Sequence, residues 1–475
     1  MPKPSEKPAI KVSPARSEAF TILMELERAS PGQPSVHADD LLRGARVTAL
    51  TPQDRNLCTT LVLGTLRWQI RLDAAIRPQL AKPNAKLDAA IRIALRLGLF
   101  QLHYLDRIPP HAAIGESVSL ARKAGHDHAS RMVNAVLRKL AQDPKLDLVA
   151  LPENPAALAA ATAHPQWLVE RWVAHYGIEV AQAICQNGQQ QPELDLRLED
   201  PAIEAELAAE GIALGPGAIL SSARRVLSGD VTTTEAFRSG SVRIQEEGSQ
   251  LIAELGGDVQ QVPKTILDCC AAPGGKTLIL AERNSQAKVT ALEISPTRCE
   301  TLRSRIAESR FAAQIDVIRG DAAELPAEPK YDLILADVPC SGTGTLGRNP
   351  EIRHRLQTAD LMRHHERQCA ILRGALRAGS GRVIYSTCSL EPEENSAVVA
   401  EVLAEHPDWR QISVADVIWE LREEGTMSLE SDQTLKSGYA PNGSLTILPG
   451  SLGPDVQTDG FFVAILEKLP ATSLQ

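Results

Sequence analysis

The chain has 475 residues, of which 43% are hydrophobic and 23% charged, as in a soluble globular protein of two or three domains. It contains no run of 18 apolar residues, so the sequence predicts no membrane span. Its eight cysteines form no CxxC pair, and we expect a reduced, cytoplasmic, monomeric protein that holds no metal.

Charge is distributed unevenly along the chain. Residues 1–150 carry 22 Lys and Arg against 14 Asp and Glu, a net charge of +8, whereas the remaining residues carry 28 against 45, a net charge of −17. A basic domain on an acidic protein suggests that this domain has an anionic partner. A solvated helical surface that is merely basic would give the same count, so charge alone leaves both interpretations open.

The first 150 residues have the periodicity of helices. The stretch from Thr51 to Asp54 is typical of a helix start, with proline at the first helical position. Apolar residues from Ile91 to Leu102 recur at i, i+4, i+8 and i+11, which forms one apolar helix face. We therefore predict an all-α bundle with a basic exterior over residues 1–150, preceded by a short disordered tail, MPKPSEKPAIKV.

A segment rich in proline and aspartate, DPKLDLVALPENPAA, follows this bundle and marks a domain boundary. Beyond it, helical HPQWLVERWVAHYG gives way to short mixed pieces such as ELDLRL and GSVRIQEEG. We predict a linker and a small α+β module over residues 151–255, in which Gln245 and Glu246 could line a neighbouring site.

Residues 256–475 contain short β-rich apolar runs, namely TILDCC, KVTALEI, QIDVIRGD, YDLILADV and RVIYSTC. Helical segments separate most of them. This alternation predicts a doubly wound α/β, Rossmann-like domain with its ligand at the carboxyl ends of the strands. DGFFVAILEK would add a final antiparallel strand.

The first of these strands leads into DCCAAPGGKT, a glycine-containing turn that opens a helix. The glycine that a phosphate-binding loop needs is replaced there by Cys270, and the GxGxxG fingerprint is absent. The next two strands end in Glu293 and in Gly320-Asp321, which suit ribose hydroxyls and an adenine amino group. One acid alone could cap a helix or face solvent, but acids on successive strand ends favour a binding site.

Two more strand ends carry cysteines inside turns rich in serine, threonine and glycine. DVPCSGTG contains Cys340, and STCS contains Cys388. A cysteine at such a place is a candidate nucleophile, and an inert buried thiol is the alternative. Sequence position alone does not decide which of the two attacks.

In this order and spacing, CAAPGGKT, DVPCSGTG and STCS resemble the signature motifs of the RNA 5-methylcytosine methyltransferases. The front domain, with LVLGTLRW and LRLGLFQLHYL, resembles the NusB-type RNA-binding domain. The whole chain is similar to the bacterial small-subunit ribosomal RNA methyltransferase B family. The resemblance implies S-adenosyl-L-methionine as cofactor and 16S ribosomal RNA as substrate, with a single-stranded or flipped-out cytosine.

The same resemblance implies roles for individual residues. It assigns attack on carbon 6 of cytosine to Cys388 and a part in product release to Cys340. A carboxylate or carboxylic acid near ring nitrogen 3 would stabilise the adduct, and Asp337, three residues before Cys340, is placed for this role. Thiolate addition to carbon 6 makes carbon 5 nucleophilic enough to accept a methyl group. The implied cofactor contacts are Cys270, Ala271, Ala272, Pro273, Gly274, Gly275, Lys276, Glu293, Asp321 and Asp337.

Other interpretations stay open. Three arginines that follow the Cys340 turn could hold RNA phosphates or act as structural salt-bridge partners; they are Arg348, Arg353 and Arg355. The chain could also be a methyltransferase of the same fold that acts on transfer RNA or on protein. A NusB-like RNA-binding or antitermination factor with a vestigial catalytic domain is a third class, which the presence of both cysteines and all the acids disfavours.

Overall fold

The computed structural model describes residues 12–28, 37–84, 86–143, 151–257, 262–328, 330–453 and 456–470. The predicted tail, apart from its last residue, and residues 144–150 of the predicted linker lie outside this part. The chain divides into two compact units. Unit 1 comprises Met1–Gln191 and Leu346–Arg355, and unit 2 comprises Pro192–Thr345 and Leu356–Gln475. The three-part division of the sequence stays a prediction.

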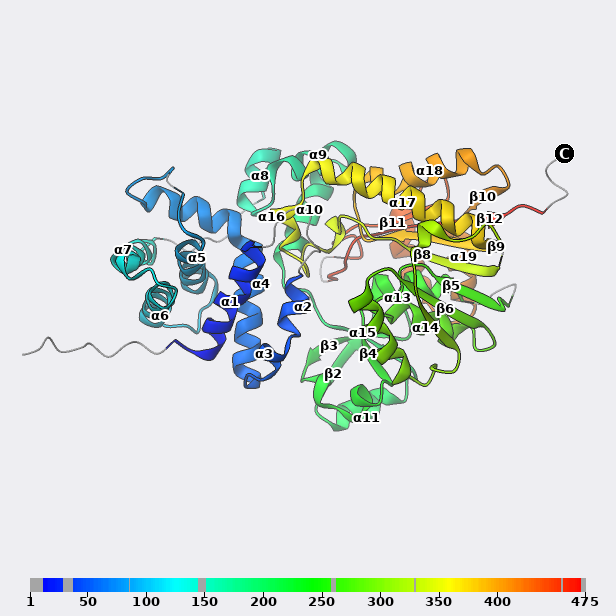
Figure 1. Cartoon of the computed structure of the whole chain (residues 1–475), viewed down its shortest axis with the longest axis horizontal. Helices are drawn as coiled ribbons and strands as arrows, with labels where there is room; N and C mark the ends of the chain where they lie inside the picture. The colour runs from blue at the N-terminus through cyan, green and yellow to red at the C-terminus, as the bar shows by residue number, and fades with distance from the viewer. Residues whose placement is uncertain are drawn as a thin grey trace, which may run out of the picture. The chain divides into compact units, whose positions relative to one another are not determined.

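The described residues of unit 1 contain helices and no strand (Figure 1). The helices are α1 (Pro14–Arg28), α2 (Ala38–Leu42), α3 (Ala45–Thr48), α4 (Pro52–Ile76), η1 (Arg77–Gln79), α5 (Ala89–Tyr104), α6 (Pro110–Lys123), η2 (Asp127–Ala129), α7 (Ser130–Leu140), α8 (Pro155–Ala161), α9 (Gln166–Tyr176), α10 (Ile178–Gln189) and α16 (Ile352–Arg355). As predicted, Pro52 opens α4, and the Thr51 hydroxyl accepts a hydrogen bond from the Asp54 amide at 3.2 Å.

The core of unit 1 is built from the apolar faces of α1, α4, α5, α6 and α7. Ile91, Leu95 and Leu99, which the periodicity places on one face of α5, are buried there together with Leu137 of α7. Polar residues occupy the opposite faces, and Arg131, Arg138 and Lys139 of α7 are all exposed. The predicted helical bundle is therefore confirmed.

Unit 2 begins with a small antiparallel sheet in the order β2-β3-β1-β4. Its strands are β1 (Asp195–Leu198), β2 (Ala213–Pro216), β3 (Ala223–Ser228) and β4 (Val242–Ile244), and its helical pieces are α11 (Ile203–Ala209), η3 (Val231–Thr233) and α12 (Glu235–Arg238). This confirms the predicted α+β module as a fold. The helices α8 to α10 that precede the sheet group with unit 1.

The larger sheet of unit 2 has the order β10-β12-β9-β8-β5-β6-β7, with β11 paired to β12. Its strands are β5 (Thr265–Asp268), β6 (Lys288–Glu293), β7 (Ile315–Arg319), β8 (Tyr331–Asp337), β9 (Gly379–Thr387), β10 (Trp409–Ile412), β11 (Leu445–Ile447) and β12 (Phe461–Lys468). Strands β5 to β9 pair in parallel, whereas β12 pairs antiparallel with β9. The doubly wound sheet and its antiparallel last strand are both as predicted.

Helices cover both faces of this sheet. Side chains alternate along a strand, so Ile266 joins a core with Leu278 and Leu302, while its neighbour Leu267 joins a second core with Leu372. The helices of this part are α13 (Glu247–Glu254), α14 (Gly275–Arg283), α15 (Pro296–Ala307), η4 (Ala322–Glu324), η5 (Thr343–Thr345), α17 (Thr358–Ala378), η6 (Pro392–Glu394), α18 (Ser396–Glu405), α19 (Val414–Glu423), α20 (Leu429–Leu435) and η7 (Lys436–Gly438). Strand order reverses between β5 and β8, where such folds bind their ligands.

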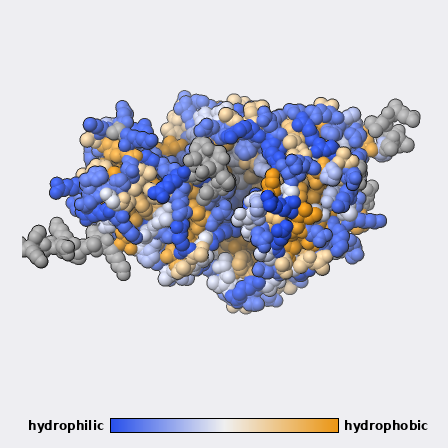
Figure 2. Space-filling view, in the orientation of Figure 1, coloured by the Kyte–Doolittle hydropathy of each residue, from blue (hydrophilic) through white to orange (hydrophobic). Residues whose placement is uncertain are grey.

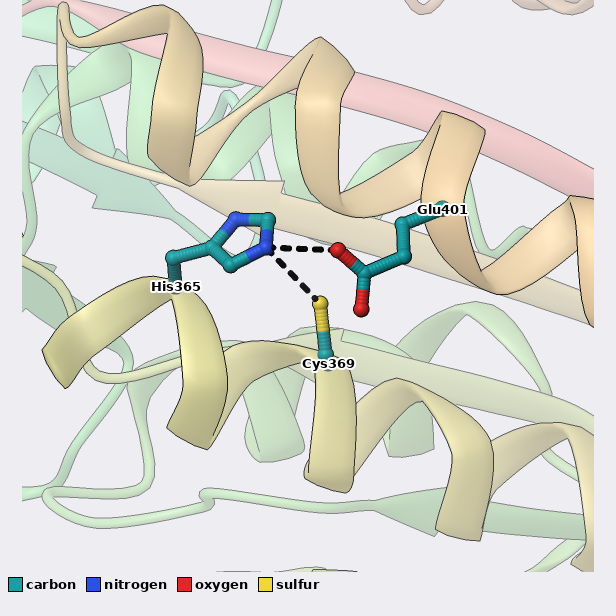
Figure 3. Close-up of side chains that lie close together, drawn as sticks. All are labelled: His365, Cys369 and Glu401. Atoms are coloured by element: carbon teal, nitrogen blue, oxygen red, sulfur yellow. Dashed lines mark hydrogen bonds and ion pairs between the residues drawn. The ribbon is translucent and has the colours of Figure 1, made fainter. Parts of the chain in front are cut away.

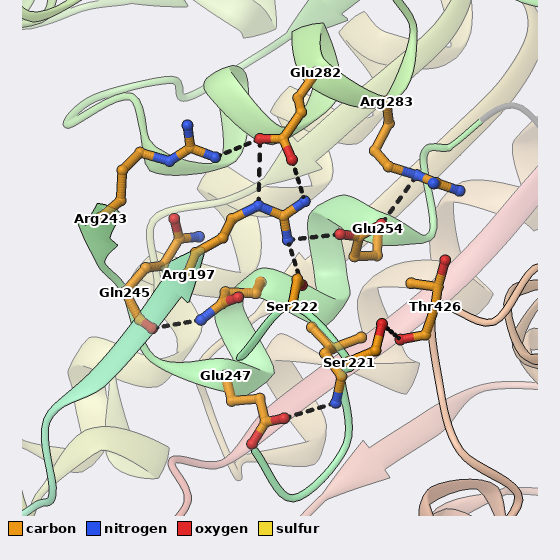
Figure 4. A network of polar contacts seen from close by, with 12 residues as sticks. Arg197, Ser221, Ser222, Arg243, Gln245, Glu247, Glu254, Glu282, Arg283 and Thr426 are labelled. Atoms are coloured by element: carbon orange, nitrogen blue, oxygen red, sulfur yellow. Dashed lines mark hydrogen bonds and ion pairs between the residues drawn. The ribbon is translucent and has the colours of Figure 1, made fainter. Parts of the chain in front are cut away.

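A buried ionic network fixes the small sheet to α13 and α14 within unit 2 (Figure 4). The Arg197 guanidinium on β1 lies 2.6 Å from Glu254 Oε1 and 2.8 Å from Glu282 Oε1. Arg243 on β4 also contacts Glu282, at 2.6 Å, and Glu199, at 2.9 Å. Because Arg197 and Arg243 share Glu282 of α14 and each has a second acidic partner, each buried charge is compensated and the small sheet is attached to both helices.

The surface carries no large apolar area on the side in view. Figure 2 shows that hydrophilic side chains cover most of this face and that apolar ones form separate patches. In the described part of the chain, every helix is too short or too polar to cross a bilayer.

Candidate active site

The turn after β5 brings bare backbone to the carboxyl end of the sheet. Gly274 has a φ of +100°, which favours glycine, and Gly275 begins α14. A Cβ on Gly274 would lie 2.8 Å from Leu302 Cδ1, and one on Gly275 would lie 2.7 Å from Gln245 Oε1. Gln245 thus lies against the start of α14, and its place in a ligand site stays a prediction.

Asp268 stabilises this turn through a side-chain hydrogen bond. Its side chain is buried at the end of β5 and accepts a hydrogen bond from the Thr277 hydroxyl at 2.7 Å. Burial raises the pKa of Asp268 to about 6. The contact joins the last residue of the strand to the first turn of α14 and so fixes the loop between them.

The predicted carboxylates at the next two strand ends have arginine neighbours. Glu293, at the end of β6, accepts from the Ser295 amide at 2.8 Å, and its other oxygen lies 3.6 Å from Arg298. Asp321, after β7, receives two hydrogen bonds from Arg367, at 2.9 and 2.6 Å. These bonds lower the pKa of Asp321 and keep it ionised. A ligand that bonds to Asp321 must share an oxygen with Arg367.

Asp337, at the end of β8, is held between two donors. Lys276 Nζ lies 2.8 Å from Asp337 Oδ2, and the Ser386 hydroxyl donates to Oδ1 at 2.7 Å. Burial lowers the pKa of Lys276, but the charges of Asp337 and Cys388 and the bond to Asp337 outweigh it, so the pKa is raised. The site thus holds a cation that is paired with a carboxylate.

The side chains of the two predicted catalytic cysteines lie next to each other. Cys340 Sγ, after β8, and Cys388 Sγ, after β9, lie 3.3 Å apart, and both residues are partly exposed and free of disulfides. The hydrogen bond with Cys388, together with burial, raises the pKa of Cys340 well above its usual range. Cys340 is therefore a protonated thiol that lies directly beside the Cys388 sulfur.

A buried glutamate ties the two cysteine turns together. Glu394, in η6, is fully buried and accepts from the Ser341 amide at 2.7 Å and from Gln368 Nε2 at 3.1 Å. The hydroxyls of Ser341 and Ser389 donate to its second oxygen. Ser341 follows Cys340 and Ser389 follows Cys388, so one carboxylate sets the spacing of both cysteines.

Comparison with known proteins identifies this arrangement. Three family models match: "16S rRNA methyltransferase RsmB/F" over residues 259–467, "NusB family" over 13–142, and the "Methyltr_RsmF/B-like, ferredoxin-like domain" over 164–228. A Bacillus subtilis protein named "Probable ribosomal RNA small subunit methyltransferase B" is 33% identical over 97% of this chain and 100% of its own length. The chain belongs to the RsmB/F methyltransferase family. A Pseudomonas putida protein named "Ribosomal RNA small subunit methyltransferase B" is 33% identical over 78% of this chain and 86% of its own length.

Solved structures agree with this family in fold. "Crystal Structure of PH0851" gives a TM-score of 0.74 at 21% identity and covers 97% of this chain and 100% of that chain. "The crystal structure of NSun6 from Pyrococcus horikoshii with SFG" gives 0.52 at 18% identity, with 64% and 98% covered. The predicted family is confirmed, and the chain is an S-adenosylmethionine-dependent RNA methyltransferase with a NusB-type RNA-binding domain.

The structure excludes one of the two interpretations left open for Arg353, that it holds an RNA phosphate. Arg353 is only 3% exposed, and within unit 1 it donates to the carbonyl oxygens of Arg67 at 3.1 Å, Leu346 at 3.3 Å and Gly188. Burial lowers its pKa to about 9. Its donors are directed at backbone oxygens, so Arg353 cannot hold an RNA phosphate. The segment after the Cys340 turn is a structural part of the helical unit.

The sequence did not single out several residues that contact the candidate site residues in the structure. Glu394 stands in the acidic run EPEEN, which looks like any solvated turn, and Arg298 and Arg367 stand on helices with many other basic residues. The sequence feature that could have indicated Glu394 is its position six residues after Cys388. Ile294, directly after Glu293, is 52% exposed.

Proposed function

We propose that this enzyme methylates carbon 5 of a cytosine in 16S ribosomal RNA through a covalent Cys388–cytosine intermediate. The observation that carries the proposal is the pair of thiols 3.3 Å apart on adjacent strand ends. Methylation of an exocyclic amine needs no nucleophile, whereas carbon methylation needs one. The names of the relatives support the choice of 16S RNA, and we expect a cytoplasmic monomer.

The cofactor proposal rests on the residues that fit it. S-adenosylmethionine supplies an electrophilic methyl group on a sulfonium. The bare backbone at Gly274 and Gly275 fits a closely approaching ligand, and the Glu293 carboxylate suits ribose hydroxyls. The exposed side chain of Ile294 offers an apolar surface to the adenine ring, and Asp321 an acceptor for its amino group. The cofactor contacts predicted for Cys270 to Lys276 and for Asp337 remain part of this proposal.

The residues of the chain can perform each proton and bond change. The Cys388 thiolate adds to carbon 6, and carbon 5 takes the methyl group. The Lys276 ammonium, held by Asp337 near ring nitrogen 3, stabilises the negative charge that the addition places on the ring. Cys340 then takes the carbon 5 proton as it passes its own proton to the Cys388 sulfur. The carbon 5–carbon 6 double bond re-forms as the sulfur–carbon bond breaks, and Cys388 later loses its proton to solvent.

The target is tested by bisulfite sequencing of RNA from a deletion strain of the source organism. The wild-type gene should restore one 5-methylcytosine in 16S RNA, and the Cys388→Ala gene should not. Restoration in transfer RNA instead would favour the alternative substrate. If the wild-type gene restores no 5-methylcytosine in either RNA, the proposal fails.

A further inference from the structure

Three possible metal ligands come together on helices α17 and α18 of unit 2 (Figure 3). His365 and Cys369 are one helical turn apart on α17, so they share a face of that helix. Glu401 points toward them from α18. One atom from each of the three side chains lies within 4.8 Å of the other two. The reaction described above uses none of these residues.

The spacing of these atoms resembles that of a tetrahedral metal site. His365 Nε2 lies 3.6 Å from Cys369 Sγ and 2.9 Å from Glu401 Oε2. Around zinc, usual bond lengths place a nitrogen and a sulfur ligand about 3.5 Å apart, and a nitrogen and an oxygen about 3.4 Å apart. The first pair already has this spacing. The second needs a shift of about half an ångström, which the 46% exposed Glu401 side chain can make.

The neighbours of the cluster orient two of the ligands. His365 Nδ1 lies 2.7 Å from the Glu393 carbonyl oxygen. A carbonyl only accepts, so Nδ1 carries the proton in the neutral ring, and the Nε2 lone pair points at Cys369 and Glu401. Arg373 donates to Glu401 Oε1 at 2.9 Å, which leaves Oε2 for a cation. Hydrogen bonds of this kind to the far side of histidine and carboxylate ligands are usual at metal sites.

We propose that His365, Cys369 and Glu401 bind one zinc ion, with water as the fourth ligand. A mixed nitrogen, sulfur and oxygen set suits zinc better than magnesium or calcium, which prefer oxygen alone. On binding, the Cys369 thiol releases its proton to solvent. The sequence led us to expect no metal because it has no CxxC pair, but this set combines a His-x₃-Cys spacing on one helix with an acid on another.

Zinc at this place would join α17 to α18 next to the active site. Gln368, between the two α17 ligands, donates to Glu394 and to the Pro339 carbonyl at 2.9 Å. Glu393, which bonds to His365, adjoins Glu394 in η6. The ion would therefore stabilise the elements that hold the two cysteine turns. This inference does not depend on the proposed reaction, because its test measures metal binding.

Cobalt(II) titration of the metal-free full-length protein tests the site, since cobalt replaces zinc and has a visible spectrum. We expect one equivalent to give tetrahedral ligand-field bands with a thiolate charge-transfer band, and zinc to displace it. Cys369→Ser should remove the charge-transfer band. Glu401→Gln, which changes an exposed side chain and should fold normally, should weaken binding at least tenfold. Zinc should raise the melting temperature of the wild type more than that of this variant.

The close pair of thiols formed by Cys340 and Cys388 is another place where cobalt could bind, and it provides the control. Cys388→Ser should keep the cobalt spectrum. A spectrum that disappears in Cys388→Ser but persists in Cys369→Ser would place the ion at the catalytic thiols and overturn the proposal. No bound cobalt in the wild type, or equal affinity in Glu401→Gln, would also overturn it and leave the cluster as a hydrogen-bonded His–Glu pair beside a buried thiol.

Discussion

Sulfur atoms 3.3 Å apart are not both ionised near neutral pH, because one thiolate raises the pKa of the other. Cys340 is the member whose pKa is raised, through its bond to Cys388 and through burial. We therefore expect Cys388→Ala to lose methylation and to form no covalent RNA adduct. Cys340→Ala should still attack and methylate, but should stall before elimination and accumulate an adduct that survives denaturing electrophoresis.

The two variants are matched, since each removes one sulfur atom from the same pair. General destabilisation would affect both alike and could not give opposite gel results. An adduct in Cys388→Ala that is absent from Cys340→Ala would reverse the two roles. Intact methylation with no adduct in any variant would exclude covalent catalysis.

The cofactor acids give a second prediction at this scale. Glu293→Ala and Asp321→Ala should each weaken S-adenosylmethionine binding by about 1.5–3 kcal/mol, because each loses a hydrogen bond to a charged group. Calorimetry with the purified protein measures this directly. The effect at Asp321 should be the smaller, since Arg367 already occupies both of its oxygens. Unchanged affinity in both variants would contradict the assignment of the cofactor site.

Glu394 is expected to act as a positioning residue. Glu394→Ala removes the acceptor shared by Ser341 and Ser389 and should lower kcat about 100-fold, the usual cost of misplacing catalytic groups by about 1 Å. KM for the cofactor should stay near the wild-type value. Glu394→Gln keeps one carbonyl acceptor and should recover much of the rate. A variant that loses stability but keeps kcat would limit Glu394 to a structural role.

At the scale of elements, the strands could be predicted from the sequence, but the hydrogen bonds between side chains on distant elements could not. Parallel strands end at one edge, so chain order alone was enough to bring Glu293, Cys340 and Cys388 to the same crevice. The role of Glu394 depends on its bonds to Ser341, 53 residues away. The two interpretations of Arg353 stayed open in the sequence for the same reason, because its acceptor on Arg67 lies 286 residues away in the chain. Sequence periodicity carries no information about such distant pairs.

The ionic network of β1, α13 and α14 gives a prediction at the same scale. Arg197→Met should lower the free energy of unfolding by about 3 kcal/mol at pH 7, because it removes one of the two arginine partners of buried Glu254 and Glu282. Glu254 keeps Arg283 and Glu282 keeps Arg243. Denaturant titration measures it. The exposed pair of Arg303 and Glu300 is the control, and Arg303→Met should cost at most about 1 kcal/mol.

The pH dependence of this loss has a definite sign. Burial raises the pKa of Glu282, but Arg197 and Arg243 outweigh it and lower the pKa below the ordinary value of 4.5. A group whose pKa is lower in the folded protein than in the unfolded chain stabilises the fold at any pH above its unfolded pKa. This stabilisation is lost as the pH falls through its folded pKa. The difference between wild type and Arg197→Met should therefore shrink below pH 4.5. A difference that stays constant down to pH 3 would contradict the ionic origin.

At the scale of the whole molecule, the division into two units decides which variants can test RNA binding without disturbing methyl transfer. Removing residues 1–150 would cut through unit 1, which also contains residues 151–191 and the segment Leu346–Arg355. Truncation would therefore leave the buried donors of Arg353 without the Arg67 carbonyl. Charge reversal on the surface leaves both units intact and is the better test.

Arg138 and Lys139 are exposed on α7, in the unit that carries the net positive charge. Reversing both to glutamate should weaken RNA binding and lower the salt slope by about 0.7 for each RNA phosphate that the protein no longer neutralises, because fewer counterions are released. Cofactor affinity should not change. The matched control reverses Arg238 and Arg410, which are exposed in unit 2, and should have the smaller effect on both affinity and slope. Equal decreases of RNA affinity and salt slope in the two double variants would mean that positive charge anywhere on the protein contributes equally. The helical unit would then have no special part in RNA binding.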